Sequence, residues 1–437
     1  MKSRVEHASA PATRYDVVTA VWGEEFVTLF LDFCIPNQLS PGNLAALPPG
    51  SRYRIFTTAT DARRLRDSSR LDEVRHVLPV DIVELDLTEA DAQTKRPSNT
   101  HKRMIACHRR AAADAAGDER ALIYLAPDFV LGEGTIAGLV RIHAAGARAV
   151  LTANLRLMRA EFVSAHAALG TRALAPRALV GLAMRHLHPW TRSLVADAAS
   201  TSDNPTSVYW PVLSRGEIEG LLVRTFYLHP MLVDPVLRTA MPGGPIDSHY
   251  VRDCVPDVAQ CYVVDDSDEL VIFELSPTGR AISNERSGLG VSPLRLAGVA
   301  ARCNGHQLSH WQQPIRLHAG DFDQRWTAAE RDSSALARRV ERYRPFGSLV
   351  VTAFSLLKWS RQRRAAYGRT YRRVRGYVWD IRKALQRTVS DARHLPKELR
   401  PPLTSKQISR AAKLVVHRAA KGGRVSVKRL RRRVGLL

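Results

Sequence analysis

Short β-branched apolar runs alternate with helix-like stretches through the first third of the chain. The apolar runs occupy residues 15–22, 53–58, 80–87, 121–128 and 147–152. Runs this short predict buried strands rather than buried helices. The stretches 61–76, 100–116 and 134–146 between them predict helices. This alternation predicts an α/β fold with an open, doubly wound, mostly parallel sheet, whose ligands bind beyond the carboxyl ends of the strands.

The ends of two of these helices carry recognisable signals. Asp61 is predicted to cap the first helix, and Gly146 lies just past the end of the third. After residue 152 the pattern is less regular. Residues 155–197 are predicted to be helical and 198–207 to form a loop, and three later segments are strand-like, namely 221–230, 260–266 and 270–276.

The net charge of +23 divides very unevenly along the chain. Residues 331–437 hold 30 lysines and arginines against 5 acidic residues, whereas the remainder carries a net charge of −2. We therefore predict two segments with different physical roles, an α/β domain over residues 14–330 and a basic, amphipathic helical region over residues 331–437. The helical patterns of the second segment cover about 331–343, 347–394 and 404–420.

Several classes of protein do not fit this sequence. The first sixteen residues lack the apolar run of a secretory signal, and the most apolar segment, 346–357, is shorter than a membrane span. The five cysteines are scattered without a CxxC pair, which favours a reducing compartment. No GxGxxG follows the first strand, and no P-loop or GxSxG motif occurs. We expect a soluble or peripheral cytoplasmic protein without a dinucleotide or P-loop site.

Aromatic and basic side chains are interleaved in the first part of the basic region. Trp359, Tyr367, Tyr371, Tyr377 and Trp379 alternate with arginines, after an apolar start. This mixture suits an anionic membrane surface, and it also suits nucleic acid, where aromatic rings stack on bases. The apolar start favours the membrane. A solvated tail without a fixed partner is the third interpretation.

Asp128 is the position with the greatest chemical promise, because it ends the predicted strand 121–128. A carboxylate there can meet a phosphate through a divalent cation or contact a ribose hydroxyl, although it can equally cap the following turn.

Residues 14–155 contain the segments YDVVTAVW, IFTT, HKRM and LIYLAPDFVLGEGTIAGLVRIHAAGARAVLT. With these segments, this part of the chain resembles the nucleotide-binding half of the GT-A nucleotide-sugar glycosyltransferases of the bacterial surface-polysaccharide type. In that family an Asp-x-Asp motif holds the metal and the diphosphate of the donor. Here the motif position reads Ala126-Pro127-Asp128, so one of the two carboxylates is absent.

By this resemblance the cofactor is a nucleotide-sugar donor, with Mn²⁺ or Mg²⁺ as a further cofactor whose need is left open by the incomplete motif. Asp128 and His249 would be the metal ligands, and Lys102 and Arg103 could hold the diphosphate without metal. The donor-binding positions expected by the resemblance are Thr19, Trp22, Thr57, Thr58, Lys102, Arg103 and Asp128.

A second group of candidates lies between residues 229 and 269. Asp247 follows a PGGP turn and is the predicted catalytic base, since an inverting transferase needs a carboxylate to deprotonate the acceptor hydroxyl. It could otherwise be a helix cap. The segment 265–269 has four carboxylates in five residues without the spacing of an EF-hand, so it is either a solvated turn or an acceptor contact. The acceptor candidates are His229, Asp265, Asp266 and Asp268.

Three functions therefore compete. The first is an inverting, hexosyltransferase-like glycosyltransferase that moves a sugar from a nucleotide-sugar donor to a lipid-linked or cell-surface polysaccharide acceptor. It would work as a peripheral protein at the inner face of the membrane. The second is a catalytically degenerate binding module of the same fold that is tethered to a membrane. The third is a nucleic-acid-binding protein that acts through the basic region.

Overall fold

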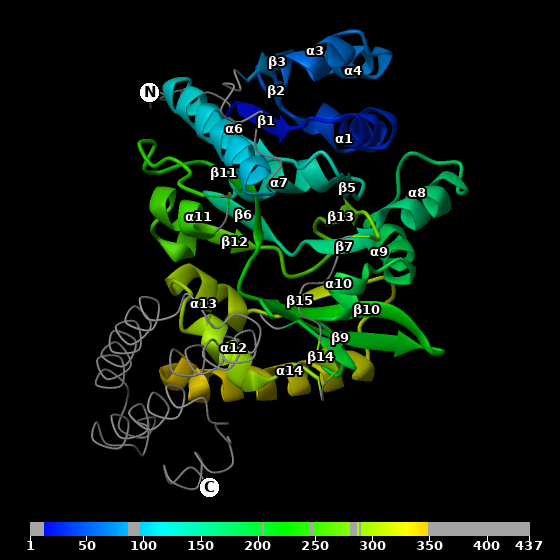
Figure 1. Ribbon diagram of the computed structural model, residues 1–437, viewed down its shortest axis with the longest axis vertical. Coiled ribbons are helices and arrows are strands. Elements are labelled where there is room, and N and C mark those ends of the chain that lie inside the picture. Colours follow the sequence, from blue (N-terminus) through cyan, green and yellow to red (C-terminus); the bar gives the residue numbers. More distant parts are fainter. Residues whose placement is uncertain are drawn as a thin grey trace, which may run out of the picture. The chain divides into compact units, whose positions relative to one another are not determined.

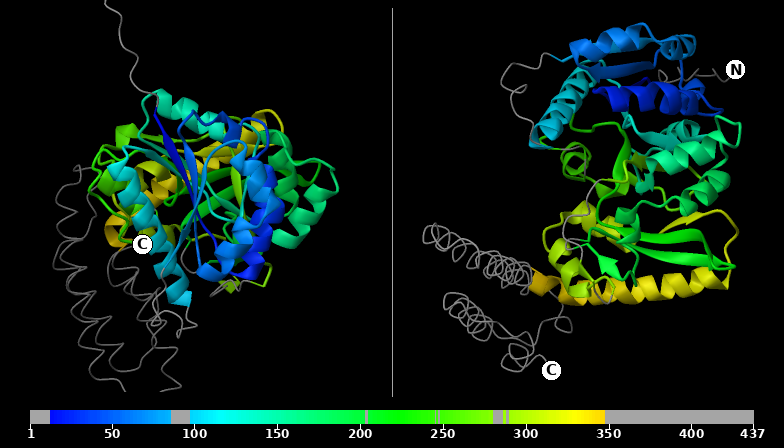
Figure 2. Two further views of the ribbon diagram at one scale, coloured as in Figure 1. Left: turned by 90° about the horizontal axis from the view of Figure 1, so that it is seen from above. Right: turned by 45° about the vertical axis from the view of Figure 1, so that its right-hand side comes forward.

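The computed structural model describes residues 13–85, 97–202, 205–244, 246, 248–279, 286–287 and 290–347. The chain divides into two compact units. The first comprises Met1–Val195, Ser207–Ser283 and Asn304–Glu330, and the second comprises Ala196–Thr206, Asn284–Cys303 and Arg331–Leu437. Figures 1 and 2 show the course of the chain in each unit.

A seven-stranded sheet forms the centre of the first unit, and its strand order is β12-β6-β11-β4-β1-β2-β3. All neighbours run parallel except β11, which lies antiparallel between β4 and β6. The predicted α/β class and mostly parallel sheet are confirmed. The strands span β1 Tyr15–Ala20, β2 Arg52–Thr57, β3 Val80–Glu84, β4 Ala121–Tyr124, β6 Ala149–Thr152, β11 His229–Val233 and β12 Cys261–Val263.

Two smaller sheets accompany the central sheet in the same unit. One has the order β5-β13-β7, with β5 at Phe129–Leu131, β7 at Leu155–Met158 and β13 at Ile272–Ser276. The other has the order β15-β10-β9, with β9 at Ser207–Ser214, β10 at Glu217–Thr225 and β15 at Ile315–His318. Arg215 and Gly216 join β9 to β10 with positive φ angles of 51° and 85°, as a two-residue hairpin of type I′ requires.

Helices of the first unit lie in the connections between the strands (Figure 1). Glu24–Leu29 (α1), Phe30–Cys34 (η1, a π turn) and Ile35–Gln38 (α2) follow β1 in succession. The further helices are η2 Leu44–Ala46, α3 Ala59–Arg66, α4 Ser69–Arg75, α6 Pro97–Gly117, α7 Thr135–Ala144, α8 Arg159–Ala167, α9 Pro176–Arg185, α10 Pro189–Arg192, α11 Ser248–Cys254, η3 Val258–Gln260 and α13 Gly305–Gln312.

The described part of the second unit contains a small strand pair, a short helix, the second part of a long helix and a final 3-10 turn. β8 (Ser200–Thr201) pairs antiparallel with β14 (Arg286–Ser287), and α12 spans Pro293–Ala300. α14 (Gln324–Tyr343) continues through residue 330 and is followed by η4 (Arg344–Phe346). Within the described ranges, no helix has both the length and the apolar character of a membrane span.

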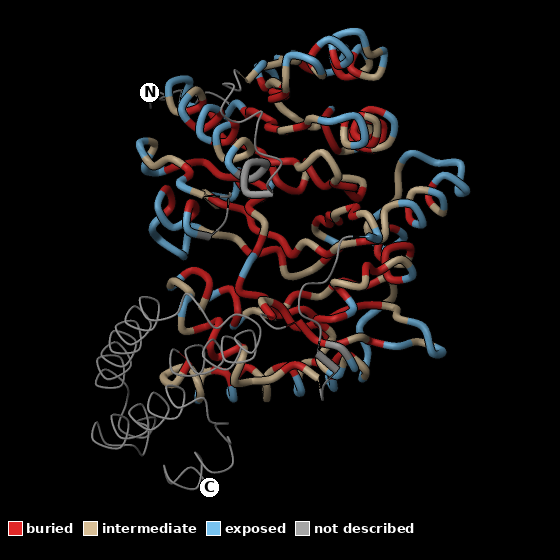
Figure 3. The backbone as a smooth tube through the Cα atoms, viewed as in Figure 1, coloured by how far each residue is buried: buried red, intermediate tan, exposed pale blue. Residues whose placement is uncertain are grey.

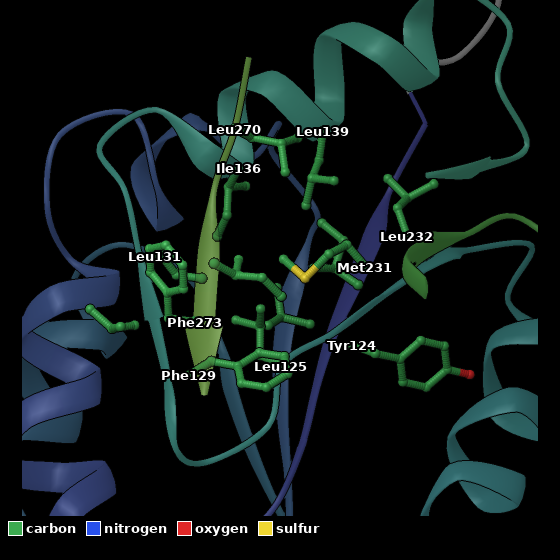
Figure 4. Close-up of a cluster of buried hydrophobic side chains, with 14 of the residues drawn as sticks. Tyr124, Leu125, Phe129, Leu131, Ile136, Leu139, Met231, Leu232, Leu270 and Phe273 are labelled. Atoms are coloured by element: carbon green, nitrogen blue, oxygen red, sulfur yellow. The ribbon is translucent and has the colours of Figure 1, made fainter. Parts of the chain in front are cut away.

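The buried side chains concentrate in the strands of the central sheet and in the helices that contact them (Figure 3). Figure 4 shows part of this core, where Leu125, Met231 and Phe273 lie together. Tyr124 lies at one end of the same cluster, with its hydroxyl directed away from the aliphatic side chains.

Two local predictions were wrong. The N-cap of the first predicted helix is Thr58 and not Asp61, because the Thr58 hydroxyl accepts from the Asp61 backbone N–H at 3.3 Å. Residues 155–158 form β7 and not a helix, because they pair in parallel with β13. The helix end before Gly146 and the helix over 331–343 are confirmed, and the helices expected after residue 347 lie outside the described residues.

Candidate functional site

The strand order of the central sheet reverses between β1 and β4. From β1 the chain moves outward to β2 and β3, and it then crosses back through α6 to place β4 on the other side of β1. β1 and β4 are parallel neighbours, but the connections that follow them run to opposite sides of the sheet. This arrangement leaves a crevice at the carboxyl ends of the two strands, and open α/β sheets bind their ligands in such a crevice. A pocket lies at this point, and Ala20 at the end of β1 and Tyr124 at the end of β4 both line it.

The pocket has a volume of about 190 Å³ and a wall of mixed character. That volume is below the ~300 Å³ at which pockets begin to enclose a drug-sized ligand, so the cavity suits one ring of a larger molecule. The apolar part of the wall comes from Ala20, Met104, Leu125, Ala126, Pro127, Phe129 and Ile246, and the polar part from His108, Tyr124, Asn154, His229 and Glu274. A mainly apolar wall with a few polar groups is typical of a small-molecule site.

Among the described residues of the pocket wall, Glu274 on β13 is the one carboxylate. Its Oε1 accepts from Arg156 Nε at 3.0 Å and from the Ser276 hydroxyl at 3.0 Å. Its Oε2 accepts from Asn154 Nδ2 at 3.2 Å. The pairing of β13 with β5 sets Glu274 opposite Phe129, which lines the same pocket. The carboxylate is therefore held in one position, as a group that acts on a substrate must be.

Asp128 lies beside this carboxylate but does not line the pocket. Its backbone carbonyl accepts from Leu275 N at 2.9 Å, which fixes the Asp128 loop against the end of β13. Loss of solvation raises the pKa of the Asp128 carboxyl to about 7, and the nearby charge of Glu274 also raises it, while Arg159 and Arg156 act in the opposite direction. Asp128 therefore exchanges its proton near neutral pH, which is the property expected of an acid or base group.

Two histidines in the pocket wall are held neutral at physiological pH. Burial lowers the pKa of His229 to about 4, and its Nε2 donates to the carbonyl oxygen of Tyr124 at 3.1 Å. Burial, with a smaller contribution from His229, lowers the pKa of His108 to about 4. His108 is only 6% exposed, and its Nδ1 has no hydrogen-bond partner within the described part of the chain. A ligand in the pocket could supply that partner.

The four predicted donor contacts at the ends of β1 and β2 differ in how far they are buried and in what they contact. Thr19 is fully buried and its hydroxyl bonds to the Tyr53 hydroxyl at 2.9 Å. Thr57 is also fully buried, and Thr58 serves as the cap of α3. Trp22 is half-buried, packs against the core and lies just past the end of β1. Of these four residues, Trp22 and Thr58 are partly exposed, and none of the four is among the described residues that line the pocket.

Lys102 and Arg103 lie on α6, the helix that also carries Met104 and His108 of the pocket wall. Lys102 is exposed, and at 100° per residue it lies on roughly the opposite side of the helix from Met104. Arg103 is half-buried. Among the described residues of the pocket wall, neither of these two basic side chains is found.

The described candidate residues between 229 and 269 do not lie together in one site. His229 belongs to the pocket wall, whereas Asp247 lies outside the described residues. His249 is exposed on α11. In the ranges that the structure describes, the His, Cys, Asp and Glu side chains that form a group of three or more suited to a metal are Asp266, Asp268 and His318, so neither Asp128 nor His249 is in such a group.

A metal at Asp128 is not favoured by its surroundings. The carboxylate that would complete a pair there, Glu274, already accepts from the Arg156 guanidinium. The Arg159 guanidinium is also close enough to Asp128 to oppose the rise in its pKa. The positive charges of Arg156 and Arg159 thus already act on these carboxylates, so the proposed chemistry uses only side chains of the chain.

Glu274, Asn154 and His108 escaped sequence reasoning because they are far apart in the chain and stand in unremarkable local sequence. Glu274 lies inside the predicted strand 270–276, and a carboxylate in an otherwise apolar strand was the one available signal.

No protein-family model matches this sequence. No curated protein sequence matches it either. Among solved structures, the chain is similar to the mannosyltransferase PcManGT from Pyrobaculum calidifontis in complex with GDP-Man and Mn²⁺. The two are 13% identical, the alignment covers 93% of this chain and 86% of that chain, and the TM-score is 0.32. Similarity at this level does not establish a common fold, so the assignment below rests on the strand order and the pocket.

Proposed function

We propose that this protein is a glycosyltransferase that uses a nucleotide-sugar donor. The observation that carries the proposal is the pocket at the switch point between β1 and β4, with the fixed carboxylate of Glu274 in its wall. Nucleotides bind at this position in open α/β sheets, and glycosyl transfer needs a carboxylate next to the donor. The resemblance of residues 14–155 to the GT-A family supports the same conclusion.

In the proposed reaction, the acceptor hydroxyl loses its proton to a carboxylate as its oxygen attacks the anomeric carbon. The bond from that carbon to the diphosphate oxygen breaks, and the nucleoside diphosphate leaves with inversion. We assign the proton-accepting role to the Glu274 carboxylate, because it lines the pocket. Arg156 would hold Glu274 in place, and His108, which lines the pocket, would contact the donor.

For the acceptor we propose a lipid-linked or cell-surface polysaccharide precursor at the inner face of the cytoplasmic membrane. The support is the charge of residues 331–437, where 30 basic residues stand against 5 acidic ones. Anionic lipid attracts each basic residue near the surface by about 1 kcal/mol, so a segment of this charge would hold the enzyme at the membrane.

The decisive experiment is a screen of nucleotide sugars against the full-length protein by thermal shift and by release of the nucleoside diphosphate. One class of donor should raise the melting temperature by several degrees, because a ligand at 100 times its Kd adds about 2.7 kcal/mol. Release of the diphosphate should then depend on an added acceptor. Stabilisation without turnover would favour the degenerate binding module, and a protein that ignores every nucleotide sugar would contradict the proposal.

A further inference from the structure

Three side chains from two distant segments meet at a place separate from the switch-point pocket. Asp266 and Asp268 follow β12, and His318 ends β15. His318 Nε2 lies 2.9 Å from Asp266 Oδ1 and 3.8 Å from Asp268 Oδ1. One potential ligand atom from each of the three lies within 4.8 Å of the other two. None of the three residues lines the pocket described above.

We propose that Asp266, Asp268 and His318 bind a divalent transition-metal ion such as Mn²⁺, Co²⁺ or Zn²⁺. The ligand set combines one imidazole nitrogen with two carboxylates. Imidazole suits the transition metals, whereas Mg²⁺ and Ca²⁺ prefer oxygen ligands alone. Metal–ligand bonds of ~2.1 Å place two adjacent ligands about 3 Å apart, which matches the distance from His318 to Asp266.

The orientation of the His318 ring suits a metal ion at this place. Nδ1 lies 2.7 Å from the carbonyl oxygen of Gly320, which can only accept, so Nδ1 carries a hydrogen. In the neutral ring, Nε2 then presents a lone pair toward the Asp266 carboxylate, which also can only accept. Two acceptors at 2.9 Å repel, so either a proton on Nε2 or a metal ion must lie between them. A histidine whose second nitrogen donates to a carbonyl is also the usual arrangement of a metal ligand.

The protein holds these side chains on a rigid base. The His318 side chain is 1% exposed, and its ring packs near Phe322 and Trp326. Ser267, between the two aspartates, is buried, donates its backbone N–H to Arg316 O at 3.0 Å and accepts from His318 N at 3.1 Å through its hydroxyl. The two aspartates and the histidine are thus fixed to each other by the backbone, so little entropy is lost when an ion binds.

Arg177 of α9 is the competing cation in this neighbourhood. Its guanidinium makes a forked contact with Asp268 at 2.8–3.0 Å and also pairs with Asp321 at 2.6 Å. A carboxylate offers about four lone pairs, so Asp268 can bind Arg177 and an ion together. Arg177 is 45% exposed, which leaves it free to move as the ion enters. The ion would link Asp266 and Asp268, which precede β13, to His318 at the end of β15. β13 is the strand that carries Glu274.

The test is a titration of the full-length protein, prepared without a polyhistidine tag and treated with a chelator, with Co²⁺. We expect one Co²⁺ per chain, weak visible absorption bands from nitrogen and oxygen ligands, displacement by Zn²⁺, and no competition from equal concentrations of Mg²⁺. Asp268→Asn and His318→Gln should each lower the affinity at least tenfold. Asp268 is exposed, so its variant should fold even if the other does not.

The matched control is Asp321→Asn, which removes the other partner of Arg177 but none of the ligands, and it should bind Co²⁺ as the wild type does. Intense near-ultraviolet bands would instead show ligation by cysteine and would overturn the assignment. The assignment would also be overturned if the wild-type protein bound neither Co²⁺ nor Zn²⁺ at millimolar concentration. In that case a proton on His318 Nε2, and not a metal ion, would form the contact with Asp266. Unchanged binding in Asp268→Asn and His318→Gln would also overturn it.

Discussion

Glu274 is one residue through which the proposed activity can be tested directly. Glu274→Gln keeps the shape of the side chain but removes the charge that faces Arg156. We expect kcat to fall at least about 100-fold with little change in donor affinity, because a proton acceptor acts only as the bond forms. The assay is acceptor-dependent release of the nucleoside diphosphate.

The control for that variant is Glu269→Gln, whose carboxylate accepts from the Tyr262 hydroxyl at 2.9 Å and does not line the pocket. It should retain wild-type turnover. If Glu274→Gln weakened donor binding and left kcat intact, Glu274 would belong to the donor-binding groups and the proton acceptor would lie elsewhere.

We expect the Asp128 carboxyl to lower the free energy of unfolding at neutral pH. Its pKa is raised to about 7, so in the folded state it keeps a proton that the unfolded chain releases from about pH 4 upward. The stability of the wild type therefore falls as pH rises from 4 to 7. Asp128→Asn has no charge to desolvate, and at pH 8 it should be more stable than the wild type by on the order of 2 kcal/mol.

Urea unfolding at pH 5, 6, 7 and 8 measures this difference, which should shrink as the pH falls. The exposed Asp253 offers a control, because Asp253→Asn should shift stability little and without this dependence on pH. A destabilised Asp128→Asn at pH 8 would mean that the charged carboxylate is stabilised by Arg159 and Arg156 more than burial opposes it.

At the scale of elements, the start of α7 depends on a loop that precedes it by ninety residues in the chain. The carbonyl oxygens of Pro41 and Gly42 accept from Gly134 N at 3.0 Å and Ala137 N at 2.9 Å, and Asn43 Oδ1 accepts from Ile136 N at 3.2 Å. The free N–H groups at the helix start are thereby satisfied from a distant segment.

Gly42→Ala should disrupt this junction. Gly42 has a φ of +72°, and an added Cβ would lie 2.7 Å from the Gly134 Cα. Gly134 has a similar φ of +75° with open space around it, so Gly134→Ala isolates the cost of the left-handed backbone, about 1 kcal/mol. Gly42→Ala should cost on the order of 2 kcal/mol or more in urea unfolding. Equal costs would show that the loop moves aside.

The comparison of β1 with β7 shows how far sequence reasoning reaches. β1 is a short run with three consecutive β-branched residues at 17–19, and it is buried on both faces, so its pattern alone identifies it. β7 has only the four residues Leu155–Met158, of types that also form helices, and it becomes a strand through pairing with β13 more than a hundred residues later. The prediction that Asp128 ends the strand 121–128 was wrong, because β4 ends at Tyr124 and Asp128 lies in the turn before β5. The place of Glu274 depends on the pairing of β13.

At the scale of the whole molecule, the basic region is separable from the pocket. All pocket residues lie within the first unit, before Ser283. α14 extends to Tyr343 with Ala337 and Val340 buried, so a truncation should follow Gly347 rather than residue 330. It would remove 25 basic and 3 acidic residues. We expect the truncated protein to stay folded, to turn over a soluble acceptor, and to lose its binding to vesicles of anionic lipid.

Vesicle co-sedimentation measures that loss. The full-length protein should bind anionic vesicles, bind neutral ones much less, and dissociate when salt shortens the screening length below ~8 Å. A full-length protein that ignores the vesicles and shifts RNA at physiological salt would assign the basic region to nucleic acid. Aggregation of the truncated protein would show that residues after 347 cover part of the folded body.

The place of β11 in the central sheet has a consequence for the protein as it is being synthesised. β11 lies between β4 and β6 but follows both of them in the chain. A ribosome that adds about 5–20 residues per second therefore exposes two unpaired strand edges until His229–Val233 has emerged. Through that interval the nascent chain presents the kind of edge on which other strands add and aggregates start. We therefore expect a chaperone that binds open strand edges to bind the nascent chain at β4 and β6 until β11 has emerged.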